Sequence, residues 1–499
     1  MSGTASDQAF DAAVDVVRTL RAAGHVAYLA GGCVRDELLG LHPKDYDVAT
    51  DATPDRVAQL FRNTQAVGEA FGVMLVKVRA PGRGANRATN RGARRGPVHA
   101  IEVATFRQEW GYADGRRPDT IQYSDAQHDA QRRDFTVNGL FWDPLTDADA
   151  ADSPDAVAHR FTVRSGHVID YVGGLADLRA GVLRAIGDPG QRFGEDYLRM
   201  LRAVRFAARF NFTLEERTTA AIRAHARHLG QISRERIGQE VRWMFTQPRG
   251  AQPGLAAKLI QALQLDGPTL NEDHADPPLP LLSALPAGAS IAAPLTAWLL
   301  DRQLPSMRTT TEPAPPAARS DAAADALASL PDDLERWRWA LAALNAGPAP
   351  VIIRRWRRAL CLTNDETAEL KSMINQLPLA LSWPVLPLAG RKRLLAQTTW
   401  SGVDGLMAAL GIAQGSSHPR LAELIEQVRR QAAQLLAQGV APPPWLTGND
   451  LIAAGRNPGP LFRRILEEAY DLQLEGQLTS RDQALGWLGQ RLVKSDENL

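Results

Sequence analysis

The sequence predicts an α+β fold, in which an N-terminal head built on a mixed β-sheet is followed by an all-helical remainder. Short apolar runs typical of strands, bounded by glycines and polar turns, are concentrated in the N-terminal part of the chain. From about residue 190 onward, apolar residues recur at helical spacing and no strand series returns. A mixed domain followed by helices accounts for both observations.

The N-terminal part contains helix and strand patterns in turn. Residues 11–24 place apolar side chains at helical spacing and end at Gly24. TPDRVAQLF begins a second helix, because Thr53 is a typical cap and Pro54 suits the first helical position. We expect strands in four further runs, which are HVAYLAGG, KDYDVAT, FGVMLVKV and HAIEVATF.

Three stretches have the composition of loops or linkers. Residues 81–97 are rich in Gly and Arg without apolar periodicity, which is typical of a flexible hairpin insertion. Residues 303–333 are rich in Pro, Ala and Thr and indicate a linker within the helical part. Another break is expected at APPPW, residues 441–445. At 499 residues the chain is long enough for several domains.

Charge, cysteine content and hydropathy exclude some classes of protein. The 57 basic and 56 acidic side chains nearly balance, so an RNA partner would have to be held by local basic surfaces. Cys33 and Cys361 are too few for a disulfide framework or a four-cysteine zinc site, which indicates a reducing compartment. The N-terminus lacks signal-peptide features, and no apolar run is long enough to cross a bilayer. We therefore expect a soluble, cytoplasmic protein with no membrane partner.

KDYDVAT offers a pair of carboxylates for metal binding. Asp45 and Asp47 are two residues apart in an expected strand, so their side chains would point to the same face. Such oxygen ligands suit Mg²⁺, which is usually held by one or two carboxylates together with substrate phosphates. Glu102, in HAIEVATF, is a candidate third carboxylate. The alternative is that all three are ordinary surface residues of strands or turns.

A glycine turn lies just upstream of the carboxylates. Gly31 and Gly32 are followed closely by Arg35. Glycines let the backbone approach a triphosphate, with amide groups aimed at its oxygens, although such a turn also serves simply to join a strand to a helix. Beside a carboxylate pair, the turn favours nucleotidyl transfer, in which metal ions activate an attacking hydroxyl and stabilise the departing pyrophosphate.

Two longer segments make the pattern specific. LAGGCVRDELLGLHPKDYDVAT contains Gly-Gly, Arg-Asp and Asp-x-Asp in that order, and a later segment reads RRDFTVN. Together they resemble the signature of the tRNA CCA-adding enzyme and bacterial poly(A) polymerase family. The candidate catalytic residues are then Asp45, Asp47 and Glu102, with Mg²⁺ on the two aspartates. The resemblance implies nucleotide binding by Gly31, Gly32, Arg35, Arg132, Arg133, Asp134 and Asn138.

EDYLRMLRAVRFAARF resembles a further motif of this family, beginning at Glu195. On a helix, Asp196 and Arg199 would share a face. A carboxylate can accept from the exocyclic amine that cytosine and adenine both carry while an arginine donates to the ring, so this pair would select CTP and ATP. A plain helix ion pair is the alternative. By resemblance, the residues of this motif that bind nucleotide are Asp196, Arg199, Arg202 and Arg205.

Three other segments bear on the resemblance. In SRERIGQE, Arg236 and Glu240 would brace a helix turn at i,i+4 spacing. WGYADGRRPDTIQ is similar to the mobile loop of enzymes that add the terminal A. His128-Asp129 is an isolated dipeptide without a surrounding cluster, so no phosphohydrolase activity is expected.

The C-terminal segment that begins WLTGNDLIAAGRNPGP is similar to the tail of bacterial CCA-adding enzymes. In that family the body and tail bind tRNA. Arg456, Arg463 and Arg464 could contact phosphates, because such contacts need only charge. A solvated helix face explains the same arginines equally well.

The resemblance implies four domains, which are a nucleotidyltransferase head at 1–165, a helical neck with the nucleotide-selecting motif at 166–250, a helical body at 251–440 and an RNA-binding tail at 441–499. The implied activity is addition of CCA to the tRNA 3′ end from CTP and ATP, with release of pyrophosphate. An A-adding enzyme or a poly(A) polymerase shares nearly all these motifs and stays an alternative. A non-catalytic RNA-binding protein on the same scaffold is the other. Mg²⁺ is the implied cofactor, and no obligatory protein partner is implied.

Overall fold

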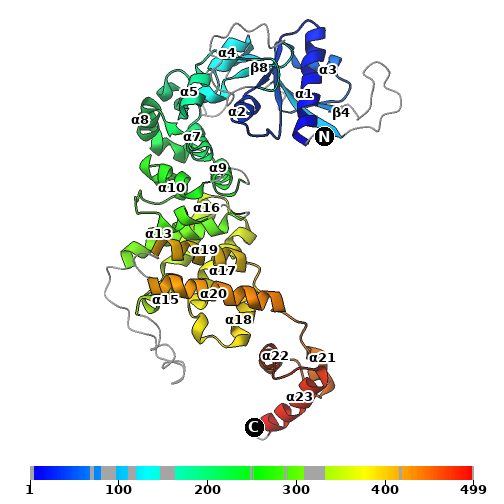
Figure 1. Cartoon of the computed structure of the whole chain (residues 1–499), viewed down its shortest axis with the longest axis vertical. Coiled ribbons are helices and arrows are strands. Elements are labelled where there is room, and N and C mark those ends of the chain that lie inside the picture. Colours follow the sequence, from blue (N-terminus) through cyan, green and yellow to red (C-terminus); the bar gives the residue numbers. More distant parts are fainter. Residues whose placement is uncertain are drawn as a thin grey trace. The chain divides into compact units, whose positions relative to one another are not determined.

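The computed structural model describes residues 5–67, 72–79, 97–110, 120–146, 163–247, 250, 252–285, 288, 290–307, 332–414 and 419–496. By internal contacts the chain divides into two units, Met1–Glu240 with Leu263–Pro268, and Val241–Ala262 with Thr269–Leu499 (Figure 1). The first unit contains a β-sheet and its flanking helices. The described part of the second unit is built from helices. This confirms the α+β class expected from the sequence.

A seven-stranded mixed sheet is the centre of the first unit. Within the described residues its strands follow the order β3-β4-β5-β2-β1-β8-β9. The pairing of β2 with β5 is parallel, and the other neighbours are antiparallel. The strands are β1 (Ala27–Ala30), β2 (Asp47–Thr50), β3 (Thr64–Ala66), β4 (Val73–Arg79), β5 (Val98–Thr105), β8 (Phe141–Asp143) and β9 (His167–Ile169).

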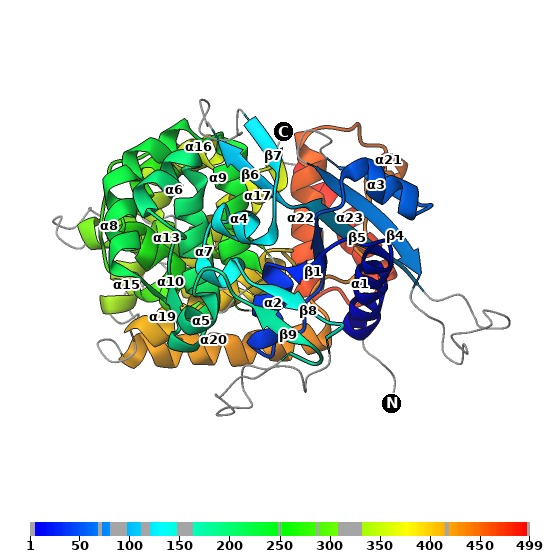
Figure 2. The ribbon, with the colours of Figure 1, turned by 90° about the horizontal axis from the view of Figure 1, so that it is seen from above.

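Helix α1 (Ala5–Ala22) covers one face of this sheet, and Figure 2 shows it alongside the strands. Leu29 and its cross-strand neighbours Val48 and Trp142 share that face, because directly paired residues point to the same side. All three are buried, and Phe10 of α1 stacks on Trp142 with ring centroids 5.0 Å apart. This side of the sheet is the apolar core of the head.

The opposite face of the sheet carries helix α4 (Ala126–Gln131) and polar side chains. Ala30 packs there in one cluster with Ala126 and Ala130 of α4. Asp47 is the cross-strand partner of Ala30, so its side chain lies on the same face. The sheet therefore separates an apolar side under α1 from a side that holds α4 and a candidate metal ligand.

Further short elements complete the first unit. Strands β6 (Arg107–Trp110) and β7 (Thr120–Tyr123) form an antiparallel pair next to α4, and β10 (Val182–Leu183) pairs in parallel with β11 (Thr213–Leu214). The helices are α2 (Gly32–Leu38), α3 (Pro54–Leu60), α5 (Gly174–Ala180), α6 (Pro189–Glu195), α7 (Leu198–Phe210), α8 (Glu216–His225) and the first part of α9 (Arg234–Thr246).

Helices in succession make up the described part of the second unit. A small hydrophobic core that includes Leu451, Ile465 and Leu488 holds the last three together. The helices are α10 (Pro253–Ala262), α12 (Pro280–Ala284), α13 (Ala292–Met307), α15 (Asp332–Ala346), α16 (Pro348–Ala359), α17 (Asn364–Leu381), α18 (Leu388–Leu395), α19 (Trp400–Gln414), α20 (Pro419–Gln438), α21 (Gly448–Ala453), α22 (Pro460–Leu474) and α23 (Arg481–Asp496); α11 (Asp266–Leu270) crosses the unit boundary.

The helix cap, the chain break and the linker expected from the sequence lie at or between these elements. The Thr53 hydroxyl accepts the N–H of Arg56 at 3.4 Å, which confirms the predicted cap of α3. The break at APPPW falls between α20 and α21 as expected. Helix α13 continues to Met307 and α15 begins at Asp332, and residues 308–331 of the linker expected at roughly 303–333 lie outside the described residues. Residues 80–96 of the Arg/Gly insertion and residues 111–119 of the expected mobile loop lie outside the described residues.

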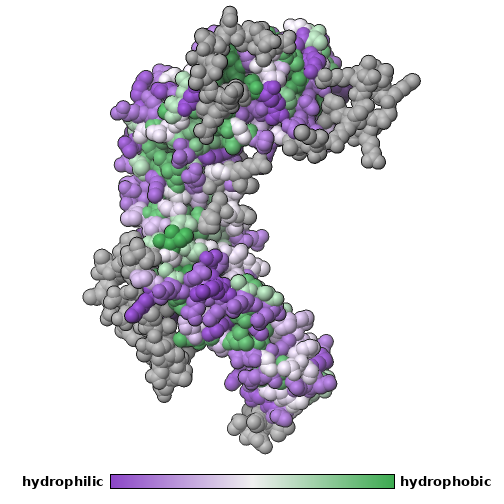
Figure 3. All heavy atoms as spheres, in the orientation of Figure 1, coloured by the Kyte–Doolittle hydropathy of each residue, from purple (hydrophilic) through white to green (hydrophobic). Residues whose placement is uncertain are grey.

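Over the part of the chain that the structure describes, no helix is both long and apolar enough to span a bilayer. The face drawn in Figure 3 mixes hydrophilic and hydrophobic residues.

Asp301 is a buried carboxylate that stabilises a helix start in the second unit. It lies in α13 with 3% of its surface exposed. Its oxygens accept the N–H groups of Leu281 and Leu282, at the start of α12, at 3.1 and 2.9 Å. Burial raises the pKa of Asp301 to about 7, although the two N–H groups act in the opposite direction.

We predict that Asp301 makes folding stability fall as pH rises. Because the folded-state pKa lies above the ordinary 3.8, the folded state binds more protons between these values. The stabilisation of the folded state by protonated Asp301 is complete below about pH 4 and is lost as pH rises from there through about 7. Its upper limit is about 4 kcal/mol. Urea denaturation of wild type and Asp301→Asn at about pH 5 and about pH 8 should show wild type losing stability relative to the variant. A difference independent of pH would contradict this role.

Candidate active site

An arginine-lined pocket of about 560 Å³ lies in the first unit. The glycine turn before α2, the segment after α4, and helices α7 and α9 all contribute to it. The eleven residues that the sequence predicted for nucleotide binding all line this pocket. Its lining is Gly31, Gly32, Arg35, Arg132, Arg133, Asp134, Asn138, Asp196, Leu198, Arg199, Arg202, Arg205, Phe206, Arg209 and Arg236.

Gly31 allows the backbone to turn directly under an arginine. Its φ of +74° lies in the left-handed region that favours glycine. A Cβ atom at this position would lie 2.7 Å from Nη1 of Arg133. The N–H of Gly31 is bonded to the carbonyl of Leu140 at 2.9 Å. The backbone conformation therefore favours glycine at position 31, and a side chain there would also displace the end of Arg133.

A buried ion pair joins the segment after α4 to helix α7. Nε and Nη2 of Arg202 donate to one carboxylate oxygen of Asp134 at 2.8 and 2.6 Å. The other oxygen accepts the N–H of Phe135 at 2.9 Å and the side-chain amide of Asn138 at 3.0 Å. Burial alone would raise the pKa of Asp134, but Arg202 and Asn138 hold it well below its usual range. Asp134 therefore stays ionised in the pocket and is held in place by four hydrogen bonds.

The same network continues from Asn138 to the first motif. Arg35 is 3% exposed and donates to the Asn138 side-chain oxygen. Nε of Arg35 also donates to Asp36 at 2.8 Å, and Arg209 of α7 donates to the second oxygen of Asp36 at 3.1 Å. Burial lowers the pKa of Arg35, and Asp36 opposes that effect. Both ends of α7 are therefore tied to motifs that lie far away in the sequence.

One face of α7 presents a row of arginines around an aromatic ring. Arg199, Arg202, Arg205 and Arg209 recur at spacings of three or four residues, and all line the pocket. The guanidinium of Arg205 lies over the ring of Phe206 at 4.2 Å. Leu201 and Ala208, on the other side of the helix, are buried. The face toward the pocket is thus cationic while the opposite face packs into the core.

The partner expected for Arg236 is wrong. Glu240 is 2% exposed and accepts from Nε of Arg205 at 2.7 Å, so it is committed to α7. Arg236 instead donates to Asp196, with an Nη2–Oδ2 distance of 2.6 Å. The i,i+4 spacing of Arg236 and Glu240 permitted a contact, but the packing of α9 against α7 directs the two side chains to different partners.

The expected helix face shared by Asp196 and Arg199 is also wrong. Asp196 has extended backbone between α6 and α7, with φ −153°, while Arg199 lies in the first turn of α7. Arg199 pairs with Glu195 and donates to the Arg192 carbonyl at 2.8 Å. Both Asp196 and Arg199 nevertheless line the pocket. The two residues therefore share a pocket without lying on one helix face.

The candidate metal ligands lie in or just before the internal strands β2 and β5 of the sheet. Asp47 begins β2 directly opposite Ala30, the residue before Gly31. In the parallel pairing, Val48 faces Val103, so Asp47 and Glu102 stand next to each other at the same level. The strand begins at Asp47, and Asp45 therefore lies just before it rather than within it, which corrects the expectation. Asp45, Asp47 and Glu102 are not part of the pocket lining.

The electrostatics of Asp47 indicate a site that favours a cation. Asp47 is exposed to solvent. Desolvation by neighbouring protein atoms, with repulsion from Glu102 and Asp45, still raises the pKa of Asp47 to about 6, while Arg133 opposes the shift. Among the described residues, no three His, Cys, Asp or Glu side chains are grouped as a closed metal cage. Two carboxylates that leave other positions to substrate phosphates fit the way Mg²⁺ is usually bound.

Four residues of the pocket lining were not predicted to bind nucleotide, and these are Leu198, Phe206, Arg209 and Arg236. Arg209 continues the spacing of Arg202 and Arg205 along α7, and this periodicity could have identified it. Arg236 comes from α9 and is brought to Asp196 only by tertiary packing, so no local signal distinguished it from other surface arginines.

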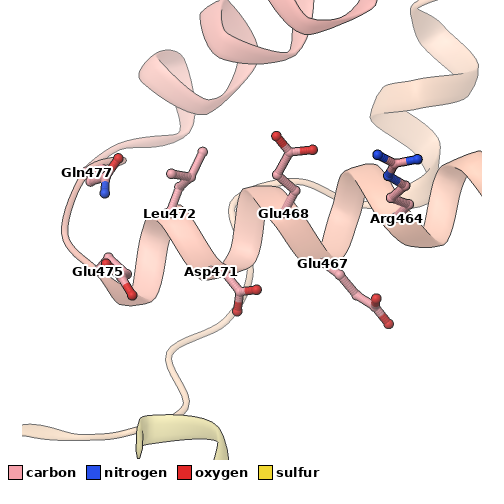
Figure 4. Close-up of a pocket in the computed structure, with 7 residues that line it drawn as sticks. All are labelled: Arg464, Glu467, Glu468, Asp471, Leu472, Glu475 and Gln477. Carbon is pink, nitrogen blue, oxygen red and sulfur yellow. The ribbon is translucent and has the colours of Figure 1, made fainter. Parts of the chain in front are cut away.

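A second hollow, of about 430 Å³, lies on α22 in the other unit. Figure 4 shows Glu467, Glu468, Asp471 and Glu475 around it, with Arg464 at one end. Four carboxylates would repel a triphosphate, so this hollow does not compete with the arginine-lined pocket. Arg463 pairs with Glu467 at 2.8 Å, which fits the alternative of a solvated helix face for the tail arginines.

Two protein families match parts of this chain. The Poly A polymerase head domain family matches residues 27–184. The family described as the probable RNA and SrmB-binding site of polymerase A matches residues 211–253. The pocket-lining glycines, Arg35 and the segment after α4 all lie within the first of these matches.

Related proteins match either the whole chain or its N-terminal half. The CCA-adding enzyme of Lacticaseibacillus paracasei is 30% identical over 473 residues, which are 94% of this chain and 93% of that protein. The CCA-adding enzyme of Levilactobacillus brevis is 37% identical over 293 residues, spanning 58% of this chain and 63% of that protein. Poly(A) polymerase I of Salmonella typhi is 41% identical over 242 residues, spanning 46% of this chain and 43% of that protein.

The fold is shared with solved structures. The crystal structure of the Bacillus stearothermophilus CCA-adding enzyme in complex with CTP superposes with a TM-score of 0.61 at 23% identity. The match covers 98% of this chain and 99% of that chain.

We predict that Asp134→Asn destabilises the protein by about 2 kcal/mol. The change leaves Arg202 without its buried counter-ion, and the cost stays below that of a fully buried pair because the Arg202 side chain is 33% exposed. Urea denaturation measures the loss. In a double-mutant cycle with Arg202→Met, the double variant should lose less unfolding free energy than the two single variants lose together. Additive losses would contradict the coupling.

Proposed function

Because the chain belongs to the CCA-adding enzyme and bacterial poly(A) polymerase family, we propose that it adds C, C and A to the 3′ end of tRNA. It is an RNA nucleotidyltransferase. The proposed reaction consumes CTP and ATP and releases pyrophosphate. The observation that carries the proposal is one pocket that combines a candidate base-reading pair with arginines suited to phosphates, beside a carboxylate pair.

The pocket arginines supply the charge that a triphosphate requires. Arg132, Arg133 and Arg202 carry planar guanidinium groups that match phosphate oxygens. Phosphoryl transfer leaves little covalent chemistry to the protein, so binding, alignment and charge stabilisation are the proposed contributions. The RNA 3′ hydroxyl would attack the α-phosphorus in line with the pyrophosphate leaving group.

Nucleotidyltransferases of this family generally use divalent metal ions. Asp45 and Asp47 are the residues proposed to hold Mg²⁺, with Glu102 as the neighbouring third carboxylate. Bound there, the ion would offset negative charge on the triphosphate and assist deprotonation of the hydroxyl. The oxygen-only donor set and the mutual repulsion at Asp47 support this assignment.

Asp196 and Arg199 are proposed to select the base. Cytosine and adenine each offer an amine to a carboxylate and a ring nitrogen to an arginine, whereas guanine and uracil reverse part of this pattern. Both residues line the pocket. Glu195 restrains Arg199, and Arg236 restrains Asp196, so each arrives with a defined orientation.

A poly(A) polymerase is the second candidate function. The 41% identity to Salmonella typhi poly(A) polymerase I over 242 residues favours it in the N-terminal half of the chain. The alignment with the Lacticaseibacillus paracasei CCA-adding enzyme continues over 94% of the chain and favours CCA addition. An enzyme restricted to A is distinguished only by activity.

The remaining assignments follow from the same family. We assign the head to residues 1–165, the neck to 166–250, the body to 251–440 and the tail to 441–499. Body and tail are proposed to bind tRNA. Two cysteines, Cys33 and Cys361, are too few for a disulfide framework, which supports a reducing, cytoplasmic setting.

The deciding experiment supplies labelled CTP and ATP, separately and together with Mg²⁺, to tRNA transcripts that end before CCA, after the first C and after CC. We expect all three transcripts to grow to a single CCA end. Extension of only the CC-ended transcript would make the protein an A-adding enzyme, and long A tails on unrelated RNA would make it a poly(A) polymerase.

The same assay tests the carboxylates. Asp47→Ala should reduce incorporation to background with unchanged thermal unfolding, because the proposed Mg²⁺ site loses a ligand. Asp55→Asn, which changes an exposed carboxylate in the first turn of α3, should retain wild-type activity. Robust turnover by Asp47→Ala would contradict the assignment.

We predict that Asp196→Ala relaxes base selection. Loss of the carboxylate removes the acceptor for the amine, so the preference for CTP and ATP over GTP and UTP should fall by about 10-fold to 100-fold. The ratio of kcat/KM values for the four nucleotides measures it. Glu216→Gln, at an exposed position of α8, is the control. A fall in overall activity with an unchanged ratio would count against base reading by Asp196.

A further inference from the structure

Asp129 is a buried carboxylate that lies behind the pocket rather than in its lining. It belongs to α4, on the face of the sheet that also carries Asp47, and only 2% of its surface is exposed. A charge so deeply buried destabilises the fold unless it is paired and hydrogen-bonded. The partners of Asp129 therefore indicate what the carboxylate does.

Each oxygen of Asp129 holds one arginine of the pocket. Oδ1 accepts from Nε and Nη2 of Arg132 at 2.9 and 2.7 Å. Oδ2 accepts from Nε and Nη2 of Arg133 at 3.2 and 3.0 Å. The backbone N–H of Arg107, in β6, also donates to Oδ1 at 3.3 Å. One carboxylate thus fixes two adjacent guanidinium groups by the same edge.

Both arginines are also restrained from other directions. Nη1 of Arg133 donates to the Asn138 carbonyl at 3.2 Å, and its guanidinium lies over the Phe141 ring at 5.0 Å. Arg192 of α6 donates to the carbonyls of Gln131 and Arg132 at 2.7 and 3.2 Å, which fixes the backbone at the end of α4. Arg132 and Arg133 each keep 19% of their side-chain surface exposed.

The charge of Asp129 persists at neutral pH. Burial acts to raise its pKa, but Arg133 and Arg132 together hold it below the ordinary value. The carboxylate therefore remains an anion with two cations, and the trio keeps a net positive charge. Arginines held in this way lose little conformational freedom when a phosphate binds.

We infer that Asp129 is a positioning residue for the triphosphate, because it directs the guanidinium groups of Arg132 and Arg133 into the pocket. This inference rests on the proposed function, in which those arginines bind phosphates. This role is not the hydrolytic one of a His-Asp motif, since Asp129 is proposed to contact neither substrate nor metal. Its effect passes entirely through the two arginines.

The inference makes a prediction that separates phosphate positioning from base selection. In Asp129→Asn one oxygen becomes an NH₂ donor, so only one arginine keeps its acceptor and the other faces a donor. KM should rise about tenfold for both CTP and ATP, which corresponds to the loss of one charge-assisted hydrogen bond. The kcat value should change by less than about threefold, because the bound reactants are otherwise unaltered.

The test measures pyrophosphate affinity by calorimetry together with the two KM values. The matched control is Asp125→Asn, because Asp125 is the exposed cap of the same helix and pairs with His128 instead. Asp129→Asn should weaken pyrophosphate binding about tenfold, and Asp125→Asn should leave it unchanged. If a folded Asp129→Asn binds pyrophosphate and both nucleotides as wild type does, the positioning role is overturned.

Two further measurements keep the outcome unambiguous. Thermal unfolding shows whether Asp129→Asn is folded at the assay temperature; if it is not, Asp129→Glu replaces it. The longer side chain keeps the charge but displaces both oxygens, so an intermediate loss of pyrophosphate affinity is expected and wild-type affinity would overturn the inference. Calorimetry requires no turnover, so the two failures are distinguishable. Wild-type protein that binds pyrophosphate without extending any tRNA transcript would refute the proposed function, whereas unchanged pyrophosphate affinity in Asp129→Asn would refute the role of Asp129.

Discussion

The buried ion pair between Asp134 and Arg202 is the contact on which the pocket depends. It joins two segments that lie 68 residues apart, the turn after α4 and helix α7. Breaking this pair leaves a charge without its counter-ion, which costs about 2 kcal/mol because the Arg202 side chain keeps 33% of its surface exposed. Moving helix α7 away from the sheet would therefore break this ion pair and destabilise the protein. Asn138 extends the same constraint to Arg35, so the glycine turn, the α4 segment and α7 keep one relative geometry.

A pocket lined by so many arginines must also be stable before any ligand binds. The structure meets this requirement by giving arginines individual carboxylates, as in the pairs Arg205–Glu240 and Arg236–Asp196. Burial lowers the pKa of Arg205 and Glu240 partly offsets the shift, which shows the desolvation that these pairs have to balance. Because the acids lie behind or beside the guanidinium groups, positive charge remains directed at the pocket. Such an arrangement is organised in advance for a polyanion and needs little rearrangement on binding.

The sheet supplies the complementary, negatively charged part of the site. Parallel pairing of β2 with β5 places Asp47 beside Glu102, and antiparallel pairing of β2 with β1 places Asp47 opposite the residue before Gly31. Asp47 and Glu102 are thus held next to the arginine pocket by strand pairing, whereas Asp45 lies just before β2. The proposed metal ions and the triphosphate would meet along this border.

The sequence by itself determined the α+β class, four of the strands in the head and the residue types at the site, because strand periodicity, helix caps and spaced motifs are local signals. It also identified eleven residues that line one pocket. Only the tertiary structure decided which acid pairs with which arginine, as Arg236 shows by contacting Asp196 instead of Glu240. The role of Asp129 was equally hidden in the sequence. Local spacing permits several ion pairs of similar energy, and the choice among them is made by burial and by the packing of helices that are distant in the chain.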